Sequence, residues 1–273
     1  MVPADGRSGP AGFEAVDASG DPAALIGLLE AARTVPGLVA AKRGLLEQLA
    51  LGTAQAALDV GCGYGADVAD MARRMPRGTQ VSGVDASEAM IAEARRRTAS
   101  FGARVSLRVG EATDLPYPDH MFDACRADTV LQHVPDPGRV VSEMARVTRP
   151  GGRVAVLEFD QGTAFLDHPD TETTRIILDT FTDAAVHGWI GRQVPRLFRL
   201  AGLTDVSVTP LVILSNAPFW RILYQSQVAR LQDQGLLTDE ETSLWWVELE
   251  EWAQEGNFLG GATVFVVAAS RPS

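Results

Sequence analysis

Three glycines alternate in a short segment that follows an apolar run. Residues 58–65 read Leu-Asp-Val-Gly-Cys-Gly-Tyr-Gly, and Ala66 opens a predicted helix directly after them. Glycine permits a tight turn and a close approach of the backbone to a ligand. With Ala66 the loop also satisfies the Gly-x-Gly-x-x-Gly/Ala pattern of dinucleotide enzymes, in which a helix N-terminus receives a pyrophosphate. By itself, the loop is therefore ambiguous about its ligand.

Asp59 lies two residues before the first of these glycines and narrows the class of ligand. A carboxylate at this position would repel a pyrophosphate, whereas it would attract the cationic amino end of a sulfonium amino acid. An oxidoreductase that uses the same type of loop is therefore the less favoured alternative.

Two further acidic residues follow later predicted strands. Asp85 comes 24 residues after Gly61, at the carboxyl end of the second strand. There a carboxylate can accept hydrogen bonds from both ribose hydroxyls, and a simple helix cap formed by Asp85 or Ser87 is an equally good interpretation. After the third strand, a turn at Glu111 offers an acid to an adenine amino group. The glycine loop, Asp85 and the Glu111 turn, each at the carboxyl end of a strand and at the right spacing, are hard to obtain together by chance.

Short β-rich runs alternate with helical segments from residue 56 onward, which is typical of a parallel sheet covered on both faces. The runs predict strands at 57–60, 80–84, 105–109, 122–126 and 153–158, and helices at 66–75, 87–101 and 136–149. The carboxyl ends of parallel strands meet at one edge of a sheet, so the glycine loop and the acids should converge there.

The chain outside this core is predicted to be mostly helical. Residues 1–20 have the composition of a disordered tail, and two helices should follow before residue 50. Beyond residue 160 the pattern predicts helices at 171–187, 193–201, 218–234 and 239–255, with strands at 206–213 and 262–269. Trp245, Leu249 and Trp252 share one helical face, so they either form core packing or belong to a lid over an apolar pocket. His168 and His187 are expected at the surface.

The loop and the two acidic turns resemble those of the class I S-adenosylmethionine-dependent methyltransferases. Within that family, the chain is similar to the ubiquinone/menaquinone C-methyltransferases and to actinobacterial natural-product methyltransferases. The resemblance covers about residues 45–160. The segments that carry it are the loop at 58–65, Gly-Val-Asp-Ala-Ser at 83–87, and residues 111–119, 121–123, 131–134 and 149–153. It implies an α/β, Rossmann-like, seven-stranded and mostly parallel sheet, with an antiparallel last strand and helical N-terminal and C-terminal lid insertions.

The resemblance also implies S-adenosyl-L-methionine as the cofactor and S-adenosyl-L-homocysteine as its product. The family usually has Asp where this chain has Glu111. The residues implied to border the methionine part are Asp59, Gly61, Cys62, Gly63 and the backbone near Arg126; Asp85 would bind ribose, Ala86 and Met90 would flank the adenine, and Glu111 with Ala112 would contact its edge. Because the resemblance fades after residue 160, it says little about the acceptor.

Methyl transfer from a sulfonium needs positioning first and a general base only for some acceptors. His133 follows the fourth strand and is the best candidate base, with a structural histidine as the alternative. Asp160, just past the fifth strand, has similar standing. The acceptor atom, whether oxygen, nitrogen or carbon, stays open.

Composition sets the remaining expectations. The net charge of −11 argues against a nucleic-acid substrate, and two cysteines without Cys-x-x-Cys spacing argue against a metal site. We find no pattern typical of a signal peptide or a membrane span. We expect a cytoplasmic enzyme of secondary metabolism that methylates a small molecule, and a homo-oligomer is one possible state. The alternative is a relative that binds the cofactor without methylating. The expected layout is a tail at 1–20 and one methyltransferase domain at 21–273, made of N-terminal helices (21–55), a cofactor core (56–160), substrate and lid helices with the sixth strand (161–260) and the final strand (261–273).

Overall fold

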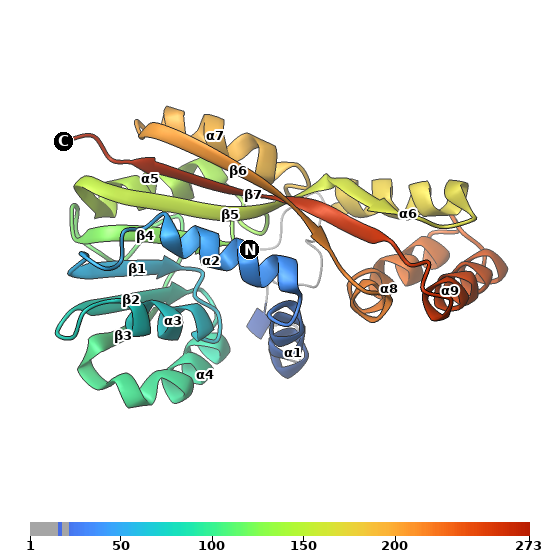
Figure 1. Cartoon of the computed structure of the whole chain (residues 1–273), viewed down its shortest axis with the longest axis horizontal. Coiled ribbons are helices and arrows are strands. Elements are labelled where there is room, and N and C mark those ends of the chain that lie inside the picture. The colour runs from blue at the N-terminus through green and yellow to red at the C-terminus, as the bar shows by residue number, and fades with distance from the viewer. Residues whose placement is uncertain (1–15, 18–21) are drawn as a thin grey trace.

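The computed structural model describes residues 16–17 and 22–273, and a seven-stranded sheet forms its centre (Figure 1). The strand order is β3-β2-β1-β4-β5-β7-β6, with β1 to β5 parallel and β7 antiparallel to both of its neighbours. The predicted fold class is confirmed. The strands are β1 (Ala56–Val60), β2 (Gln80–Asp85), β3 (Val105–Val109), β4 (Phe122–Asp128), β5 (Thr148–Leu166), β6 (Thr204–Leu214) and β7 (Gly260–Ser270).

Helices cover both faces of this sheet because successive strand residues are buried on opposite sides. Ala57 packs with α2 and α3 on one face, whereas Leu58 packs with α5 and α7 on the other. The helices near the sheet are α2 (Pro36–Glu47), α3 (Ala66–Arg74), α4 (Glu88–Thr98) with a 3-10 turn (Ala99–Arg104), α5 (Pro137–Val147) and α7 (Ile190–Leu200).

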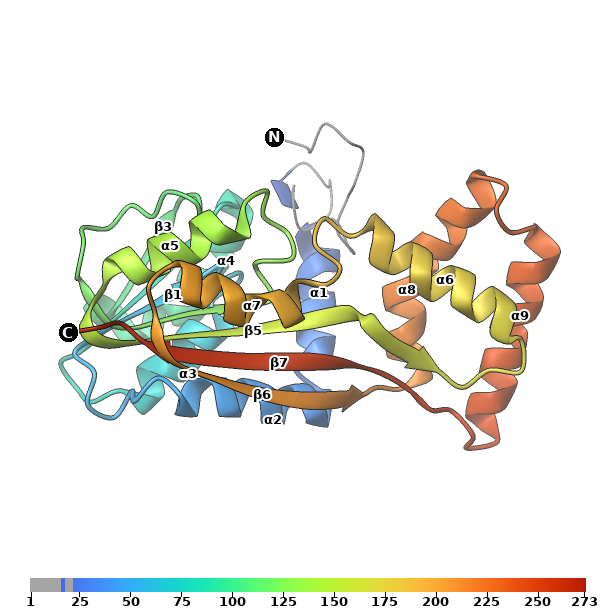
Figure 2. The same ribbon diagram turned by 90° about the horizontal axis from the view of Figure 1, so that it is seen from above.

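Strand β5 is longer than predicted at both ends. The prediction covered only the apolar run at 153–158, whereas β5 starts at Thr148, which pairs with Phe122, and continues to Leu166, which pairs with Gly260. A register shift between Asp160 and Phe165 separates the two parts of its ladder with β7. The partner strand, rather than local hydrophobicity, sets these limits. Beyond the shift, β5 and β7 stay paired and extend past the parallel strands to the C-terminal helices (Figure 2).

The C-terminal helices form a hydrophobic cluster of their own, built by α6 (Thr171–Ala184), α8 (Ala217–Asp233) and α9 (Asp239–Gln254). Trp245 and Leu249 are buried in this cluster, so core packing is the role of that face of α9. His168 is also buried and stacks on Trp245 with 5.0 Å between ring centroids. The predicted surface position of His168 is therefore wrong, because α9 covers it; His187 is half-buried and lies 3.0 Å from the Val134 carbonyl oxygen.

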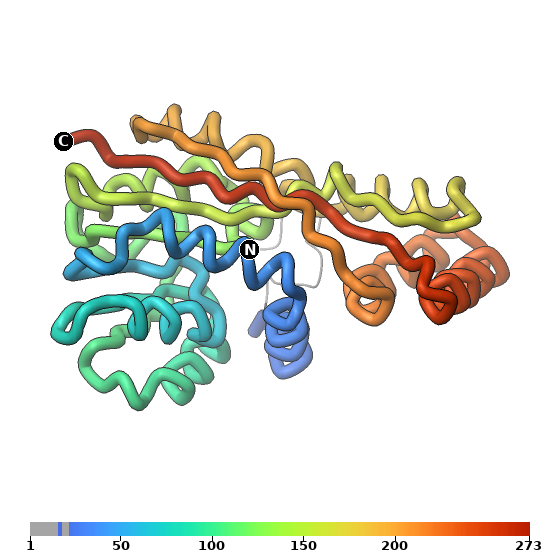
Figure 3. The backbone as a smooth tube through the Cα atoms, in the orientation of Figure 1, coloured from blue at the N-terminus to red at the C-terminus, as the bar shows by residue number. Residues whose placement is uncertain are grey.

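Helix α1 (Pro22–Ala32) lies between the sheet and the C-terminal helices, as the tube in Figure 3 shows. Most of the predicted disordered tail falls outside the described residues and stays a prediction. Asp17, which belongs to that segment, is described and accepts hydrogen bonds from Ser87 Oγ and from the Glu88 and Ala89 N–H groups. In the described ranges no single helix is long and apolar enough to cross a membrane; α1 and α2, bent by 86°, pass that test only as a pair and only by length and composition.

Candidate active site

A cavity of about 530 Å³ lies at the carboxyl ends of β1 to β5, where the strand order reverses between β1 and β4. In parallel α/β sheets this position is the usual place for a ligand. Side chains from α1, β6 and α8 close the cavity on the other side. Eight of the residues singled out from the sequence line it, namely Gly61, Gly63, Asp85, Ala86, Met90, Glu111, Ala112 and His133.

A smaller cavity of about 100 Å³ adjoins the first and shares Gly61 and Gly63 with it. The remaining predicted cofactor residues, Asp59, Cys62 and Arg126, line this second space. The structure therefore brings all ten predicted cofactor residues to two connected cavities on one edge of the sheet.

The glycine loop adopts backbone angles that only glycine takes without strain. Gly61 and Gly63 have φ values of +66° and +50°. A Cβ on Gly61 would lie 2.3 Å from Val130, so no side chain fits there. A Cβ on Gly63 would meet nothing nearer than Leu29 at 3.8 Å. Gly63 thus leaves open a volume that a side chain would fill.

Asp85 joins this loop to the end of β2. Its Oδ2 accepts a hydrogen bond from the Gly63 N–H at 2.8 Å, and its Oδ1 accepts one from the Ser87 N–H at 3.0 Å. The N-cap of α4 is Ser87, whose side chain accepts from the Met90 N–H. Burial raises the pKa of Asp85 above its ordinary value. Of the two interpretations drawn from the sequence, the capping role belongs to Ser87, and Asp85 faces the cavity.

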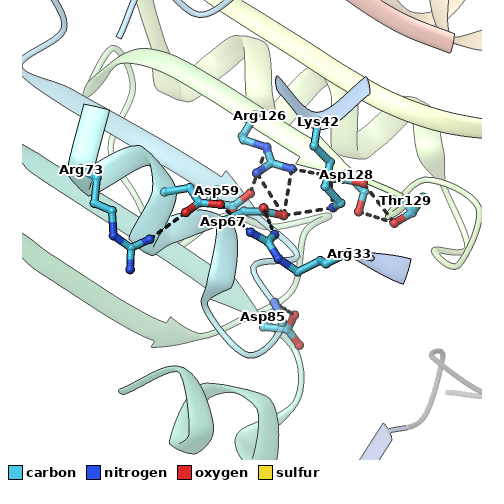
Figure 4. Close-up of polar contacts among 11 residues, drawn as sticks. Arg33, Lys42, Asp59, Asp67, Arg73, Asp85, Arg126, Asp128 and Thr129 are labelled. Carbon is cyan, nitrogen blue, oxygen red and sulfur yellow. Dashed lines mark hydrogen bonds and ion pairs between the residues drawn. The ribbon is translucent and has the colours of Figure 1, made fainter. Parts of the chain in front are cut away.

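Asp59 faces a buried arginine (Figure 4). Arg126 is only 1% exposed, and its Nε lies 3.5 Å from Asp59 Oδ1, an ion-pair distance without hydrogen-bond geometry. Another guanidinium nitrogen of Arg126 donates to Asp128 Oδ2 at 2.7 Å. Burial raises the pKa of Asp59 to about 7, and Arg126 offsets this only in part.

Two cations from the N-terminal segment, Arg33 and Lys42, complete this charge network (Figure 4). Lys42 on α2 lies 3.2 Å from Asp67 and 2.5 Å from Asp128, and Arg33, just after α1, lies 2.5 Å from Asp67. Burial opposes the charge of Asp67, but the three cations hold its pKa well below its usual range. Sequence reasoning missed Arg33 and Lys42, since no local pattern marks which helical cation reaches a distant loop.

The turn after β4 is shaped by a buried acid on β5. Thr129 has φ +54°, an unusual value for a β-branched residue. The Val130 and Leu131 N–H groups donate to Glu158 Oε1 at 2.8 and 2.6 Å. Burial raises the pKa of Glu158 to about 8. Glu158, also missed in the sequence, thereby positions the turn that carries His133.

The two candidate bases occupy different environments. His133 lines the larger cavity, and its Nε2 lies 3.0 Å from the Gln132 side-chain nitrogen. Asp160 lines neither cavity; it is fully buried, and both carboxylate oxygens pair with the Arg192 guanidinium at 2.5 and 2.7 Å. The next residue, Gln161, lies in the cavity wall instead. Of the two candidate bases, the structure therefore brings only His133 to the predicted site.

Aromatic side chains from α8 and β5 make up much of the remaining wall. Phe219, Trp220 and Tyr224 project from α8, and Phe159 comes from β5. Trp220 and Tyr224 stack with 4.5 Å between ring centroids. The helix that shapes the pocket is thus α8, whereas the tryptophan face of α9 supports it from behind.

Comparisons with known proteins agree with this geometry. The family model described as a methyltransferase domain matches residues 58–156. The chain is 34% identical over 232 residues to an uncharacterized 37.1 kDa protein in transposon TN4556 of Streptomyces fradiae, covering 84% of this chain and 66% of that protein, just under two thirds of its length. It is 30% identical over 188 residues to a demethylmenaquinone methyltransferase of Halalkalibacterium halodurans, covering 62% of this chain and 76% of that protein.

Solved structures share the fold. Phosphoethanolamine N-methyltransferase 2 of Haemonchus contortus, in complex with S-adenosyl-L-methionine, aligns with a TM-score of 0.62 at 20% identity, covering 96% of this chain and 60% of that one. The resemblance inferred from the sequence motifs is confirmed. The chain belongs to the family of S-adenosylmethionine-dependent methyltransferases.

Proposed function

We propose that this protein transfers the methyl group of S-adenosylmethionine to a small-molecule acceptor held in the same cavity. One observation carries the proposal: the glycine loop, Asp85 and Glu111 line a single cavity that continues into an apolar chamber. A ligand with a ribose, a purine and a charged amino-acid end has a matching group at each of these places.

The nucleoside half of the cofactor suits the end of the cavity near β2 and β3. Asp85 is half-buried, and each of its two carboxylate oxygens can accept a hydrogen bond from a ribose hydroxyl beside the backbone N–H that it already accepts. Ala86 and Met90 supply apolar surface for the adenine, and Glu111 can accept from its amino group. The open volume beside Gly63 permits a close approach of ligand to backbone.

The amino-acid end suits the smaller polar cavity. Its walls carry both charge signs, with Arg33 and Lys42 opposite Asp67 and Asp128. A zwitterion with one ammonium and one carboxylate can exchange partners with these pairs, so no charge is left buried and unpaired. This match supports the proposal for the whole cofactor rather than for a nucleoside alone.

When bound, S-adenosylmethionine supplies an activated methyl group: a lone pair of the acceptor forms the new bond to carbon, and the sulfur keeps the electrons of the broken bond. The protein's task is to hold the acceptor in line and exclude water, and positioning of this kind contributes roughly 7–11 kcal/mol. His133 lies where it can take the proton that a phenol or an amine must lose. Such a base would contribute about 10²–10⁴-fold.

Two rival functions are separated by binding and turnover. Calorimetry with S-adenosylhomocysteine should give a heat signal that NAD does not, whereas an oxidoreductase would show the reverse. Incubation with labelled S-adenosylmethionine and a panel of phenols, amines and prenyl acceptors should then produce labelled product. Binding without any turnover would favour a relative that keeps the cofactor but does not methylate.

The class of acceptor, the metabolic role and the cellular location are also part of the proposal. The net charge of −11 favours a small acceptor over a nucleic acid, because neutralisation of phosphates needs a basic surface. A role in secondary metabolism in the cytoplasm, expected from the sequence, is part of the same proposal.

A further inference from the structure

The inner part of the larger cavity, which we name the acceptor chamber, is built by β5, β6 and α8 rather than by the cofactor segments. It is defined by Phe159, Gln161, Ser215, Phe219, Trp220 and Tyr224. Phe159 pairs with Val264 of β7, Gln161 lies in the register shift that follows Asp160, and Ser215 follows β6. This chamber is the space left for an acceptor once the nucleoside occupies the end near Asp85.

The acceptor chamber offers no charged partner. Among the described residues that line the larger cavity there is no lysine or arginine. The larger cavity has three carboxylates, and none of them belongs to the acceptor chamber. Asp85 lies at the end of β2 and Glu111 after β3, and Asp128 is already paired with Lys42 and Arg126. An anion buried among aromatic rings without a partner loses its hydration at a cost of several kcal/mol, whereas the ring faces attract a cation. The chamber should therefore discriminate against anions.

Gln161 is a polar side chain in this wall that suits a ligand without a negative charge. Its side chain is 7% exposed and has no hydrogen-bond partner among the described residues, while its backbone N–H donates to the Gly188 carbonyl oxygen at 2.8 Å. An amide both donates and accepts, so it can bind a hydroxyl, an N–H or a carbonyl group without a charge. The backbone contact keeps the residue in place at the start of the register shift in β5.

We infer that the acceptor carries no anionic group and has an aromatic or aliphatic body, oriented by a hydrogen bond to Gln161. This inference rests on the proposed function, because it assigns the cofactor to the other end of the cavity. It narrows the acceptor class from any small molecule to one without an anionic group, and it makes Gln161 a specificity-determining residue.

The chain offers a matched pair of positions for testing the inference. Ser215 lines the acceptor chamber, whereas the preceding residue, Leu214, is 51% exposed and lies outside the cavity. Ser215→Lys places a cation in the chamber, and Leu214→Lys adds the same charge to the surface one residue away. Any effect of net charge on the whole protein is common to both variants.

The probes are N-phenylnaphthylamine, which is neutral, and anilinonaphthalenesulfonate, which has the same rings and one sulfonate. Both are titrated by fluorescence into the full chain saturated with S-adenosylhomocysteine. The wild type should bind the neutral probe at least about tenfold more tightly, a ratio that corresponds to about 1.4 kcal/mol. Ser215→Lys should remove or reverse that ratio, and Leu214→Lys should leave it within about twofold. Gln161→Leu should weaken the neutral probe, which carries an N–H, by several-fold.

Equal or tighter binding of the sulfonate by the wild type would overturn the inference. So would a Ser215→Lys variant that is folded by circular dichroism and keeps the wild-type ratio. Failure of the proposed function is a separate result, because it would appear as no heat with S-adenosylhomocysteine, whatever the two probes do.

Discussion

The Oδ2 atom of Asp85 lies 2.8 Å from the Gly63 backbone nitrogen and accepts its hydrogen bond. This bond joins the ends of two neighbouring strands, since Val60 of β1 pairs in register with Val84 of β2. The proposed ribose-binding carboxylate and the proposed methionine-binding loop are thus held together by a direct hydrogen bond. A change in either residue should therefore disturb the other.

Asp85→Ala should weaken S-adenosylhomocysteine binding by about 1–3 kcal/mol, because hydrogen bonds to ribose are lost along with the anchor of the loop. Asp85→Asn, which keeps one carbonyl oxygen, should lose less. Calorimetry measures both, and Asp114→Asn is the control because Asp114 is exposed and does not line the cavity. Unchanged affinity in Asp85→Ala would contradict the assignment.

Gly63→Ala should reduce cofactor affinity through the Cβ that it projects into the open volume, and Gly63→Val should abolish binding. The control is Gly78→Ala, since Gly78 also has positive φ, at +90°, but a Cβ there meets nothing within 4 Å. Both alanine variants should lose about 1–2 kcal/mol of stability from left-handed backbone strain. Only the Gly63 variants should lose binding; a folded Gly63→Val protein with normal affinity would mean that the loop has another role.

Glu158→Gln should change how stability depends on pH. Burial raises the pKa of Glu158 from 4.5 to about 8, so between these values the folded protein holds a proton that the unfolded chain releases. Wild-type stability should therefore fall as pH rises through this window, with each pKa unit corresponding to about 1.4 kcal/mol. Gln has no such proton and keeps the acceptor for the Val130 and Leu131 N–H groups.

The free energy of unfolding of both proteins is measured in urea at the two ends of that window. The variant should gain stability relative to the wild type at the alkaline end. Since the pKa of Asp59 is raised as well, the comparison uses the difference between the two proteins rather than the slope of either. A difference that stays constant with pH would refute the buried-proton explanation.

His133→Ala and Asp160→Asn should separate catalysis from structure. With an acceptor identified by the panel, His133→Ala should lower turnover by up to about 10²–10⁴-fold while S-adenosylhomocysteine affinity stays near normal. Asp160→Asn should instead lower the melting temperature, because it weakens the ion pair with Arg192, and should leave turnover almost unchanged. Wild-type turnover in His133→Ala would return that residue to a structural role.

The sequence by itself determined which residues lie at the proposed cofactor edge of the site. The glycine loop follows β1, Asp85 ends β2 and Glu111 comes two residues after β3, so their positions next to these strands already place them at the carboxyl edge of a parallel sheet. Local spacing is sufficient in such cases, because the segment between strand and ligand is only a few residues long.

Only the tertiary structure decided what surrounds that edge. It placed Gln161 in the cavity wall and Asp160 on the other side of β5 against Arg192 of α7, because neighbouring strand residues point to opposite faces and the elements packed on each face decide which one borders the cavity. It also brought Arg33 and Lys42 to the acids of the loop and α8 to the acceptor chamber. Contacts of this kind join segments far apart in the chain. The spacing of apolar residues within one segment does not indicate which distant segment it will contact.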